Sequence, residues 1–236
     1  DLLDLSRALP IAREAVAGGA DWIEAGTPLI KSEGMESVRR LRAEFPGNDI
    51  VADMKVADTG ALEVEMAAKA GASVVCILGD ADDVVIGEAV ETASVYGIRL
   101  MADLINVDDP VRRSRELEAL GVQIINAHVG IDQQMIGKSS LDLLEKIRGA
   151  VEIEIAVAGG LDAVTAPQAS LRGADIVIVG GAITRAADVR ESARTVREAL
   201  DSPCQEIPAP VSLSGEVREL FSGVSAPNIS DAMHRK

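Results

Sequence analysis

The sequence is poor in aromatic residues and in cysteine. Aromatics make up 2% of the 236 residues, so the core must be aliphatic and a base-stacking site for nucleic acid is not expected. The two cysteines, Cys76 and Cys204, imply neither a disulfide framework nor a zinc site.

Positive charge and long apolar runs are also scarce. The chain has 23 basic and 38 acidic residues and a net charge of −15, which argues against nucleic acid as a partner. No stretch approaches ~18 uninterrupted apolar residues, so we expect no membrane-spanning segment. No signal peptide is visible, and we expect a cytoplasmic protein.

Apolar runs of strand length alternate with amphipathic, helical stretches along most of the chain. Continuously apolar strands that alternate with helices indicate a parallel sheet covered by helices. The expected strands are 22–26, 50–55, 73–79, 99–105, 124–130, 153–160 and 175–181. The expected helices are 6–17, 35–45, 61–70, 83–96, 110–119, 141–147, 163–171 and 189–200.

If each of the eight expected helices follows a strand, the seven expected strands are one too few. The chain opens at Asp1-Leu2-Leu3, directly before the first helix, so we expect the missing strand to precede that helix. Residues 1–201 are therefore predicted to form a TIM (β/α)8 barrel whose first strand is largely truncated. A doubly wound sheet is the alternative, but it would need no repeat at this regular spacing.

Four helix-to-strand joints carry a similar glycine, at Gly19, Gly71, Gly121 and Gly173. A glycine at this position closes a helix where a left-handed residue is wanted. This is internal repetition on a βα period, as a barrel predicts, and we assign these glycines no chemistry.

The apolar run 50–52 ends in Asp53 and Lys55, with Asp58 in the loop beyond. Alternate side chains share a face of a strand, so Asp53 and Lys55 are expected to project together. An ammonium between carboxylates stays protonated, which makes Lys55 a poor Schiff-base nucleophile but a good fixed cation for a developing oxyanion. A surface ion-pair cluster is the alternative interpretation.

Active sites of TIM barrels lie at the carboxyl ends of the strands. The polar residues expected there are Asp1, Glu24, Asp53, Lys55, Asp103 and His128. Glu24 and Asp53 would stand at neighbouring strand ends, and oxygen ligands of this kind suit Mg²⁺. Alternatively, Glu24 is an ion-pair partner of Lys55.

His128 is the single histidine of the barrel region, since His234 lies in the tail. Its place at a strand end, facing the acid-lysine cluster, favours a general acid or base over a hydrogen-bonded core residue.

The last two expected strands end in the pairs Gly159-Gly160 and Gly180-Gly181. Paired glycines allow an anion to approach the backbone, and the loops after strands seven and eight are the usual phosphate site of TIM barrels. Arg185 could add a charge-assisted contact. Two tight turns without a ligand are the alternative.

These segments resemble the 3-hexulose-6-phosphate synthase family, within the orotidine-5′-phosphate decarboxylase suprafamily. The resemblance covers residues 1 to about 200 and rests on residues 1–3, 23–30, 52–60, 103–105, 127–134 and both Gly-Gly loops. The sister family of 3-keto-L-gulonate-6-phosphate decarboxylases typically has an arginine shortly after the histidine. This chain has Val129-Gly130-Ile131 there, which favours the synthase family.

The resemblance implies an aldol addition of formaldehyde to D-ribulose 5-phosphate, or its reverse, with Mg²⁺ or Mn²⁺ as cofactor. Glu24 and Asp53 would ligate the metal. Lys55 would stabilise the enediolate, and His128 would move a proton at the first carbon of the sugar.

The resemblance also implies contacts to the rest of the substrate. The glycine loops and Arg185 would hold the phosphate, while Asp1 and Asp58 would hold sugar hydroxyls or Lys55. Asp58 would reach the site of the neighbouring subunit, so a homodimer with shared active sites is expected.

Other functions stay open at this point. A Schiff-base aldolase would need a neutral Lys55, which the flanking acids oppose. A phosphosugar-binding regulatory subunit would keep the glycine loops but not the acid, lysine and histidine set. A decarboxylase of the same suprafamily is a further alternative, and a phosphopentose epimerase would need several histidines.

The composition of the sequence changes after Leu200, where prolines become frequent. Residues 202–213 contain three prolines and are predicted to be a linker, and 214–236 to be a helical tail that starts a second domain. Residues 224–233 resemble the opening of the ribonuclease-activity regulator A family. A C-terminal helix that docks on the barrel is the alternative.

Overall fold

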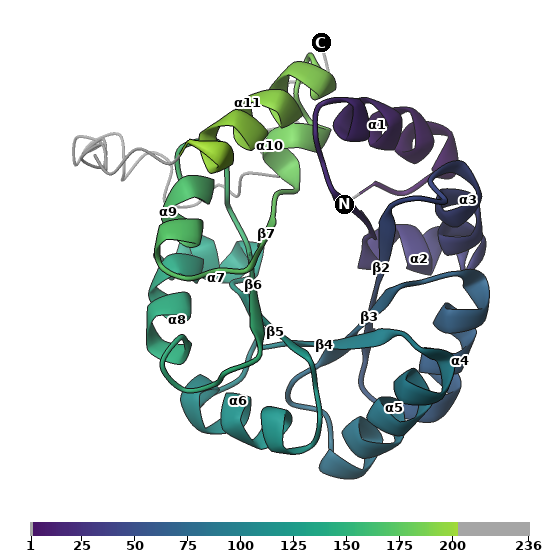
Figure 1. Cartoon of the computed structure of the whole chain (residues 1–236), viewed down its shortest axis with the longest axis vertical. Helices are drawn as coiled ribbons and strands as arrows, with labels where there is room; N and C mark the ends of the chain where they lie inside the picture. The colour runs from purple at the N-terminus through teal and green to yellow at the C-terminus, as the bar shows by residue number, and fades with distance from the viewer. Residues whose placement is uncertain (1, 203–236) are drawn as a thin grey trace.

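The computed structural model describes residues 2–202, which form one curled parallel sheet inside a ring of helices (Figure 1). Neighbouring strands along the chain are neighbours in the sheet, in the order β1 to β7, and every pair is parallel. The strands are β1 (Trp22–Ala25), β2 (Asp49–Val56), β3 (Val74–Leu78), β4 (Arg99–Asp103), β5 (Ile124–His128), β6 (Glu154–Ala158) and β7 (Ile176–Ile178).

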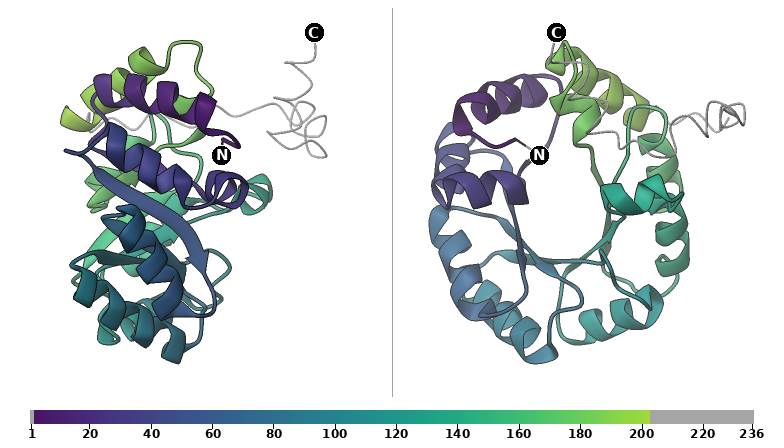
Figure 2. Two further views of the ribbon diagram at one scale, coloured as in Figure 1. Left: turned by 90° about the vertical axis from the view of Figure 1, so that its right-hand side faces the viewer. Right: turned by 180° about the vertical axis from the view of Figure 1, so that it is seen from behind.

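Helices follow the strands and cover the outside of the sheet, as two further views show (Figure 2). They are α1 (Leu5–Ala17), α2 (Thr27–Glu33), α3 (Glu36–Glu44), α4 (Gly60–Ala70), α5 (Asp83–Tyr96), α6 (Pro110–Ala119), α7 (Ile131–Met135), α8 (Ser140–Ile147), α9 (Ala166–Leu171), α10 (Gly181–Thr184) and α11 (Val189–Asp201). The first and last of these, α1 and α11, pack against each other and complete the outer ring.

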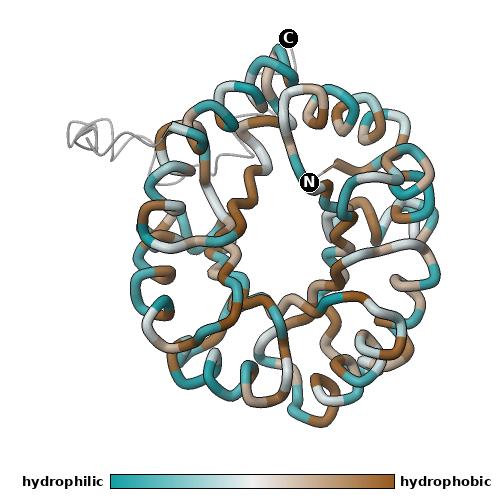
Figure 3. The backbone as a smooth tube through the Cα atoms, in the orientation of Figure 1, coloured by the Kyte–Doolittle hydropathy of each residue, from teal (hydrophilic) through white to brown (hydrophobic). Residues whose placement is uncertain are grey.

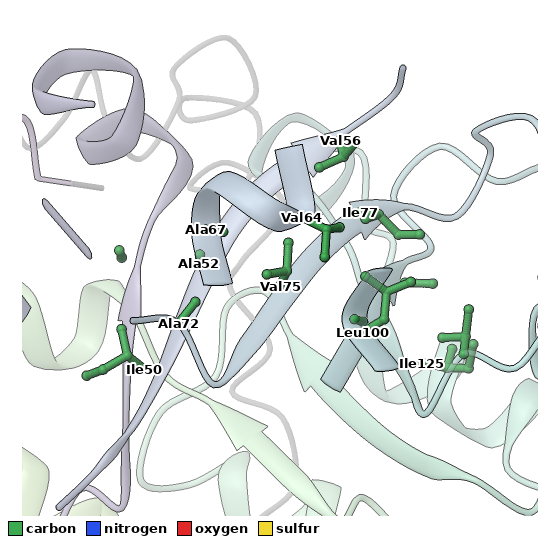
Figure 4. Close-up of a cluster of buried hydrophobic side chains, with 14 of the residues drawn as sticks. Ile50, Ala52, Val56, Val64, Ala67, Ala72, Val75, Ile77, Leu100 and Ile125 are labelled. Carbon is green, nitrogen blue, oxygen red and sulfur yellow. The ribbon is translucent and has the colours of Figure 1, made fainter. Parts of the chain in front are cut away.

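Strand side chains alternate between two apolar layers, because successive residues of a strand point to opposite faces. The outward set packs under the helices: Val64 and Ala67 of α4 lie over Val75 and Ile77 of β3 (Figure 4). The inward set fills the barrel and includes Val51, Val74, Cys76, Met101, Ile124 and Ala156. Hydropathy along the backbone shows brown strands within helices of mixed colour (Figure 3).

Between the two edge strands, β1 and β7, lies a cavity of about 580 Å³. Its walls include Ile23 and Glu24 of β1, Ile178 of β7, Ala12 of α1 and Val196 of α11. The cavity occupies the place of an eighth strand, so the described residues form a TIM barrel with seven of its strands in place. The prediction of the fold is confirmed.

Arginine side chains form hydrogen bonds with the helix-to-strand joints at the amino-terminal end of the barrel. Arg42 of α3 donates to the Gly71 carbonyl at 2.8 Å and to Ser73 Oγ at 2.7 Å. Arg148, the residue that caps the carboxyl end of α8, makes a similar arrangement at the next such joint but one: it donates to the Gly173 carbonyl and to the Asp175 carboxylate, both at 3.0 Å. The joint glycines have positive φ as predicted, 103° at Gly71 and 93° at Gly173.

Several element bounds differ from the prediction. Three short helices were not expected: α2, α7 and α10, of 7, 5 and 4 residues. Six of the seven expected strands run too far at their carboxyl ends, most clearly β7, which pairs with β6 over only three residues. The exception is β2, which extends one residue beyond its expected end. Within residues 2–202, no helix is both long and apolar enough to cross a membrane.

The predicted linker (202–213, apart from Ser202) and the predicted tail (214–236) lie outside the described residues, and so does Asp1.

Candidate active site

A bulge in β2 carries the lysine of the site. Ala52 pairs with Val75 and Val56 with Ile77, so β2 has two more residues than β3 between these points. Lys55 lies in this bulge with φ 49°, a left-handed conformation that is uncommon for a residue with a side chain. Asp53 and Lys55 therefore meet as predicted, but through a bulge and not through the regular alternation of a strand.

Two carboxylates hold the Lys55 ammonium. Its Nζ lies 3.0 and 3.1 Å from the two oxygens of Asp53 and 2.8 Å from Oδ2 of Asp103. Burial acts to lower the pKa of Lys55, but the negative charges of Asp53 and Asp103 outweigh it and raise the pKa above its usual value. Lys55 is thus a permanent cation at the barrel mouth, and a Schiff-base role is disfavoured.

Asp103, at the end of β4, joins the lysine to the histidine. Its side chain is fully buried, and Oδ2 accepts from Lys55 and from Nδ1 of His128, each at 2.8 Å. Oδ1 accepts from the Ile105 backbone N–H at 2.8 Å. Burial acts to raise the pKa of Asp103, but the bonds from His128 and Lys55 together lower it.

An ionised carboxylate only accepts hydrogen bonds. Nδ1 of His128 therefore carries a hydrogen and donates it in the bond to Asp103. Whenever the ring is neutral, the other ring nitrogen, Nε2, is then the acceptor. His128 lies at the end of β5 with 21% of its side chain exposed. This places a ring nitrogen at the barrel mouth, while the predicted role as a general acid or base stays a prediction.

Glu24 of β1 stands beside Asp53 of the neighbouring strand β2. The surrounding barrel wall, together with the negative charge of Asp53, raises the pKa of Glu24 to about 7. Its side chain still reaches solvent, because the barrel is open beside β1. The Lys55 ammonium bonds to Asp53 and Asp103, and within residues 2–202 the Glu24 carboxylate makes no salt bridge.

The donor sets in this region differ in the ions that they suit. Ligand atoms of Asp53, Cys76 and Asp103 lie within 4.8 Å of one another. The thiol does not suit Mg²⁺, burial raises the pKa of Cys76, and Lys55 already bridges the two acids. Glu24 and Asp53 offer oxygens alone, and this pair fits Mg²⁺ or Mn²⁺.

The loop after β6 packs tightly against the loop after β5. Gly159 and Gly160 have φ of 107° and 72°. A Cβ on Gly159 would lie 2.3 Å from the Val129 carbonyl, and one on Gly160 would lie 2.7 Å from Oε1 of Gln134. A side chain at Gly159 would thus collide with backbone, whereas at Gly160 the end of the Gln134 side chain could move and glycine is favoured by the left-handed φ. Both preferences hold whether or not a phosphate binds there.

After β7, the chain turns at Gly180-Gly181 into α10. The Arg185 guanidinium folds back over this turn, since a Cβ on Gly181 would lie 2.0 Å from its Nη2. The glycine pair and the arginine are thus together at one exposed turn, while the phosphate role stays a prediction.

Asp58 is exposed, and its Oδ1 accepts from the Thr59 backbone N–H at 2.7 Å. Within the chain, the second carboxylate on Lys55 is Asp103 and not Asp58, which corrects the expectation that Asp53 and Asp58 bracket the lysine. Asp58 instead adds to burial in raising the pKa of Glu63.

Comparison with known proteins agrees with this geometry. The model of the Orotidine 5'-phosphate decarboxylase / HUMPS family matches residues 1–196. A 3-hexulose-6-phosphate synthase from Bacillus subtilis is 38% identical over 199 residues, which is 84% of this chain and 94% of the relative.

This chain belongs to that family.

Solved structures give the same result. The 3-hexulose-6-phosphate synthase from Salmonella typhimurium superimposes with a TM-score of 0.82 at 35% identity, covering 85% of this chain and 95% of that one. A 3-keto-L-gulonate-6-phosphate decarboxylase from Vibrio cholerae gives 0.76 at 26% identity, covering 85% and 94%. Within the family, the chain is thus more similar to these synthases than to this decarboxylase.

The sequence prediction gave no specific function to two residues of the site, Asp103 and Thr27. Asp103 was recognised only as a strand-end acid, and the apolar run Leu100–Ala102 before it gives the same signal as the run before Asp53. Thr27 follows β1 and donates to Asp53, but only the short motif Gly26-Thr27-Pro28 marks it in the sequence.

Proposed function

We propose that this chain is a 3-hexulose-6-phosphate synthase, which adds formaldehyde to D-ribulose 5-phosphate or catalyses the reverse cleavage. The observation that carries the proposal is the chain of contacts Lys55–Asp103–His128, in which one carboxylate holds both a permanent cation and a base. The synthases among the relatives support the choice of substrates.

His128 is the residue that moves the proton. Its Nε2 removes a proton from the first carbon of ribulose 5-phosphate, and the electron pair of that C–H bond forms the enediolate. The resulting imidazolium is stabilised by the Asp103 carboxylate on Nδ1. The Lys55 ammonium stabilises the oxyanion of the enediolate.

The first carbon of the enediolate then attacks the carbon of formaldehyde and forms the new C–C bond. The carbonyl oxygen of formaldehyde becomes an alkoxide and takes the proton back from His128. The proton count balances, and His128 returns to its neutral form.

Glu24 and Asp53 would hold Mg²⁺ or Mn²⁺, whose positive charge offsets the charge on adjacent sugar oxygens. Carboxylates at adjacent strands and the absence of a thiol from this pair support the assignment.

Gly159, Gly160, Gly180, Gly181 and Arg185 would bind the phosphate. The guanidinium folded over the second glycine pair supports this role.

The active unit would be a cytoplasmic homodimer in which Asp58 contributes to the partner's site. Its exposed carboxylate, which makes no bond to the Lys55 of its own chain, supports this arrangement. Asp1 would bind a sugar hydroxyl.

The test is an assay of ribulose 5-phosphate consumption that depends on added formaldehyde, with Mg²⁺ and with chelator. His128→Gln should also stop exchange of the first-carbon protons with deuterated water, while substrate still binds. A wild-type protein that binds ribulose 5-phosphate but neither consumes it nor exchanges its protons would instead be a binding subunit. Turnover of 3-keto-L-gulonate 6-phosphate in its place would make it a decarboxylase.

A further inference from the structure

Thr27 is the first residue of α2 and contacts the bulged residue Asp53 in two ways. Its Oγ1 lies 2.7 Å from Oδ2 of the Asp53 carboxylate and 2.9 Å from the Asp53 backbone carbonyl. The residue is buried, with 9% of its surface exposed. It is therefore packed in place beneath the acid and is not free to turn towards solvent.

The position of Asp53 needs such a contact, because the bulge interrupts the ladder between β2 and β3 from Ala52 to Val56. A bulged residue loses part of its regular pairing. The carboxylate of an aspartate also turns about a broad two-fold torsion, so one contact does not fix its plane. Lys55 reaches both oxygens of Asp53, but a lysine side chain is long and flexible.

We propose that Thr27 is a positioning residue that fixes the Asp53 carboxylate and, through it, the Lys55 ammonium. The inference rests on the proposed function, in which Asp53 is a metal ligand and Lys55 stabilises the enediolate. The hydroxyl has one hydrogen, which it donates either to the carboxylate or to the bulged carbonyl of the same residue. In both cases, Asp53 is tied to the start of α2.

The chemical consequence is a carboxylate with a fixed orientation. Oδ2 lies within hydrogen-bond distance of both Thr27 and Lys55. Among the described residues, Oδ1 accepts from Lys55 alone and keeps a lone pair free. Residues that orient a metal ligand typically change metal affinity or activity by about 10- to 100-fold when they are removed.

Two substitutions separate the hydroxyl from the shape of the side chain. Thr27→Val keeps the branched shape and removes the donor, whereas Thr27→Ser keeps the donor. We expect Thr27→Val to lower kcat about 10- to 100-fold, with the KM for ribulose 5-phosphate changed less than about 3-fold. Thr27→Ser should restore most of this loss.

A second readout does not depend on catalysis. Mn²⁺ binding, followed by electron paramagnetic resonance titration, should weaken about 10-fold in Thr27→Val and stay close to wild type in Thr27→Ser. The matched control is Ser114→Ala, which removes a buried hydroxyl that donates to the Pro110 carbonyl within α6 at 2.7 Å. It should lower Tm and leave kcat and Mn²⁺ affinity unchanged.

Wild-type kcat and wild-type Mn²⁺ affinity in folded Thr27→Val protein would overturn the proposal. Equal losses in Thr27→Val and Thr27→Ser would also overturn it, because packing and not the hydroxyl would then matter. If the wild type proves inactive with formaldehyde and ribulose 5-phosphate, the proposed function fails, while the Mn²⁺ titration still decides the role of Thr27.

Discussion

Asp103→Asn is the substitution with the most specific expected outcome. The asparagine keeps the size of the side chain and an oxygen that can accept from the Ile105 N–H. Its NH₂ group, however, only donates, and so do the Lys55 ammonium and the Nδ1–H of His128 that it would face. The substitution therefore turns two charge-assisted hydrogen bonds into donor–donor contacts.

The structure sets the size of the effect on stability. Removing one partner of a buried ion pair costs about 3–5 kcal/mol. Lys55 keeps Asp53 and has 23% of its side chain exposed, so we expect a loss of about 3 kcal/mol, at the lower end of that range. For turnover, a misoriented general base costs about 10²- to 10⁴-fold, so kcat should fall about 10³-fold.

The assay combines kcat with ¹⁵N spectra of the histidines. The chain has only His128 and His234, so the His128 ring signals are readily assigned. In the wild type, Nδ1 should carry the proton, whereas Asp103→Asn should shift the neutral ring towards the form protonated on Nε2. The control is Asp175→Asn, which breaks the ion pair with Arg148 away from the mouth and should leave both readouts unchanged. An Asp103→Asn protein with wild-type kcat and an unchanged tautomer would refute the role of Asp103.

Three further outcomes follow from the same contacts. Glu24 has a pKa raised to about 7 and must be ionised to bind a metal, so Mn²⁺ affinity should fall about 10-fold between pH 8 and pH 6. Glu24→Gln should remove this dependence, and a wild-type affinity independent of pH would contradict it. Mixing inactive Asp58→Ala with inactive Lys55→Ala should restore part of the activity, since mixed dimers contain one site with both wild-type residues. No recovery although mixed dimers form would show that Asp58 serves its own subunit. Arg42→Met should lower the free energy of unfolding by about 2–4 kcal/mol in denaturant titrations, because several carbonyls lose their donor, without changing kcat. A loss of kcat in the folded variant would contradict a purely structural role.

Much of the fold was predictable because local signals mark most of the elements. The bounds of α5 and α6 match the prediction, since Asp82 and Asp109 cap their first turns and Gly97 ends α5 in a left-handed conformation. The helix α2 was missed because its seven residues are too few to show a helical period. The strand β7 was predicted too long because its length depends on pairing with β6, which an apolar run does not reveal.

The site was predictable as a set of residues but not as a network. The strand-end rule gathered Glu24, Asp53, Lys55 and His128, and the structure places all four towards the carboxyl ends of their strands. The bond from Lys55 to Asp103 joins residues 48 positions apart, and no local pattern shows it. The bulge in β2 depends on its register with β3, so the conformation of Lys55 could not be read from the segment that contains it.

Positive φ at residues other than glycine distinguishes the mouth of the barrel from its amino-terminal end. At the amino-terminal joints, glycines such as Gly71 and Gly173 adopt positive φ, where no side chain is needed and strain is avoided. Among the described residues, the non-glycine residues with positive φ are Lys55, Thr59 and Asn106, and all three lie at the mouth. A side chain in this conformation costs of order 1 kcal/mol and persists where its surroundings hold it. For Lys55, the two carboxylates supply that restraint, so the same contacts that keep the ammonium charged also hold it in a strained and defined position.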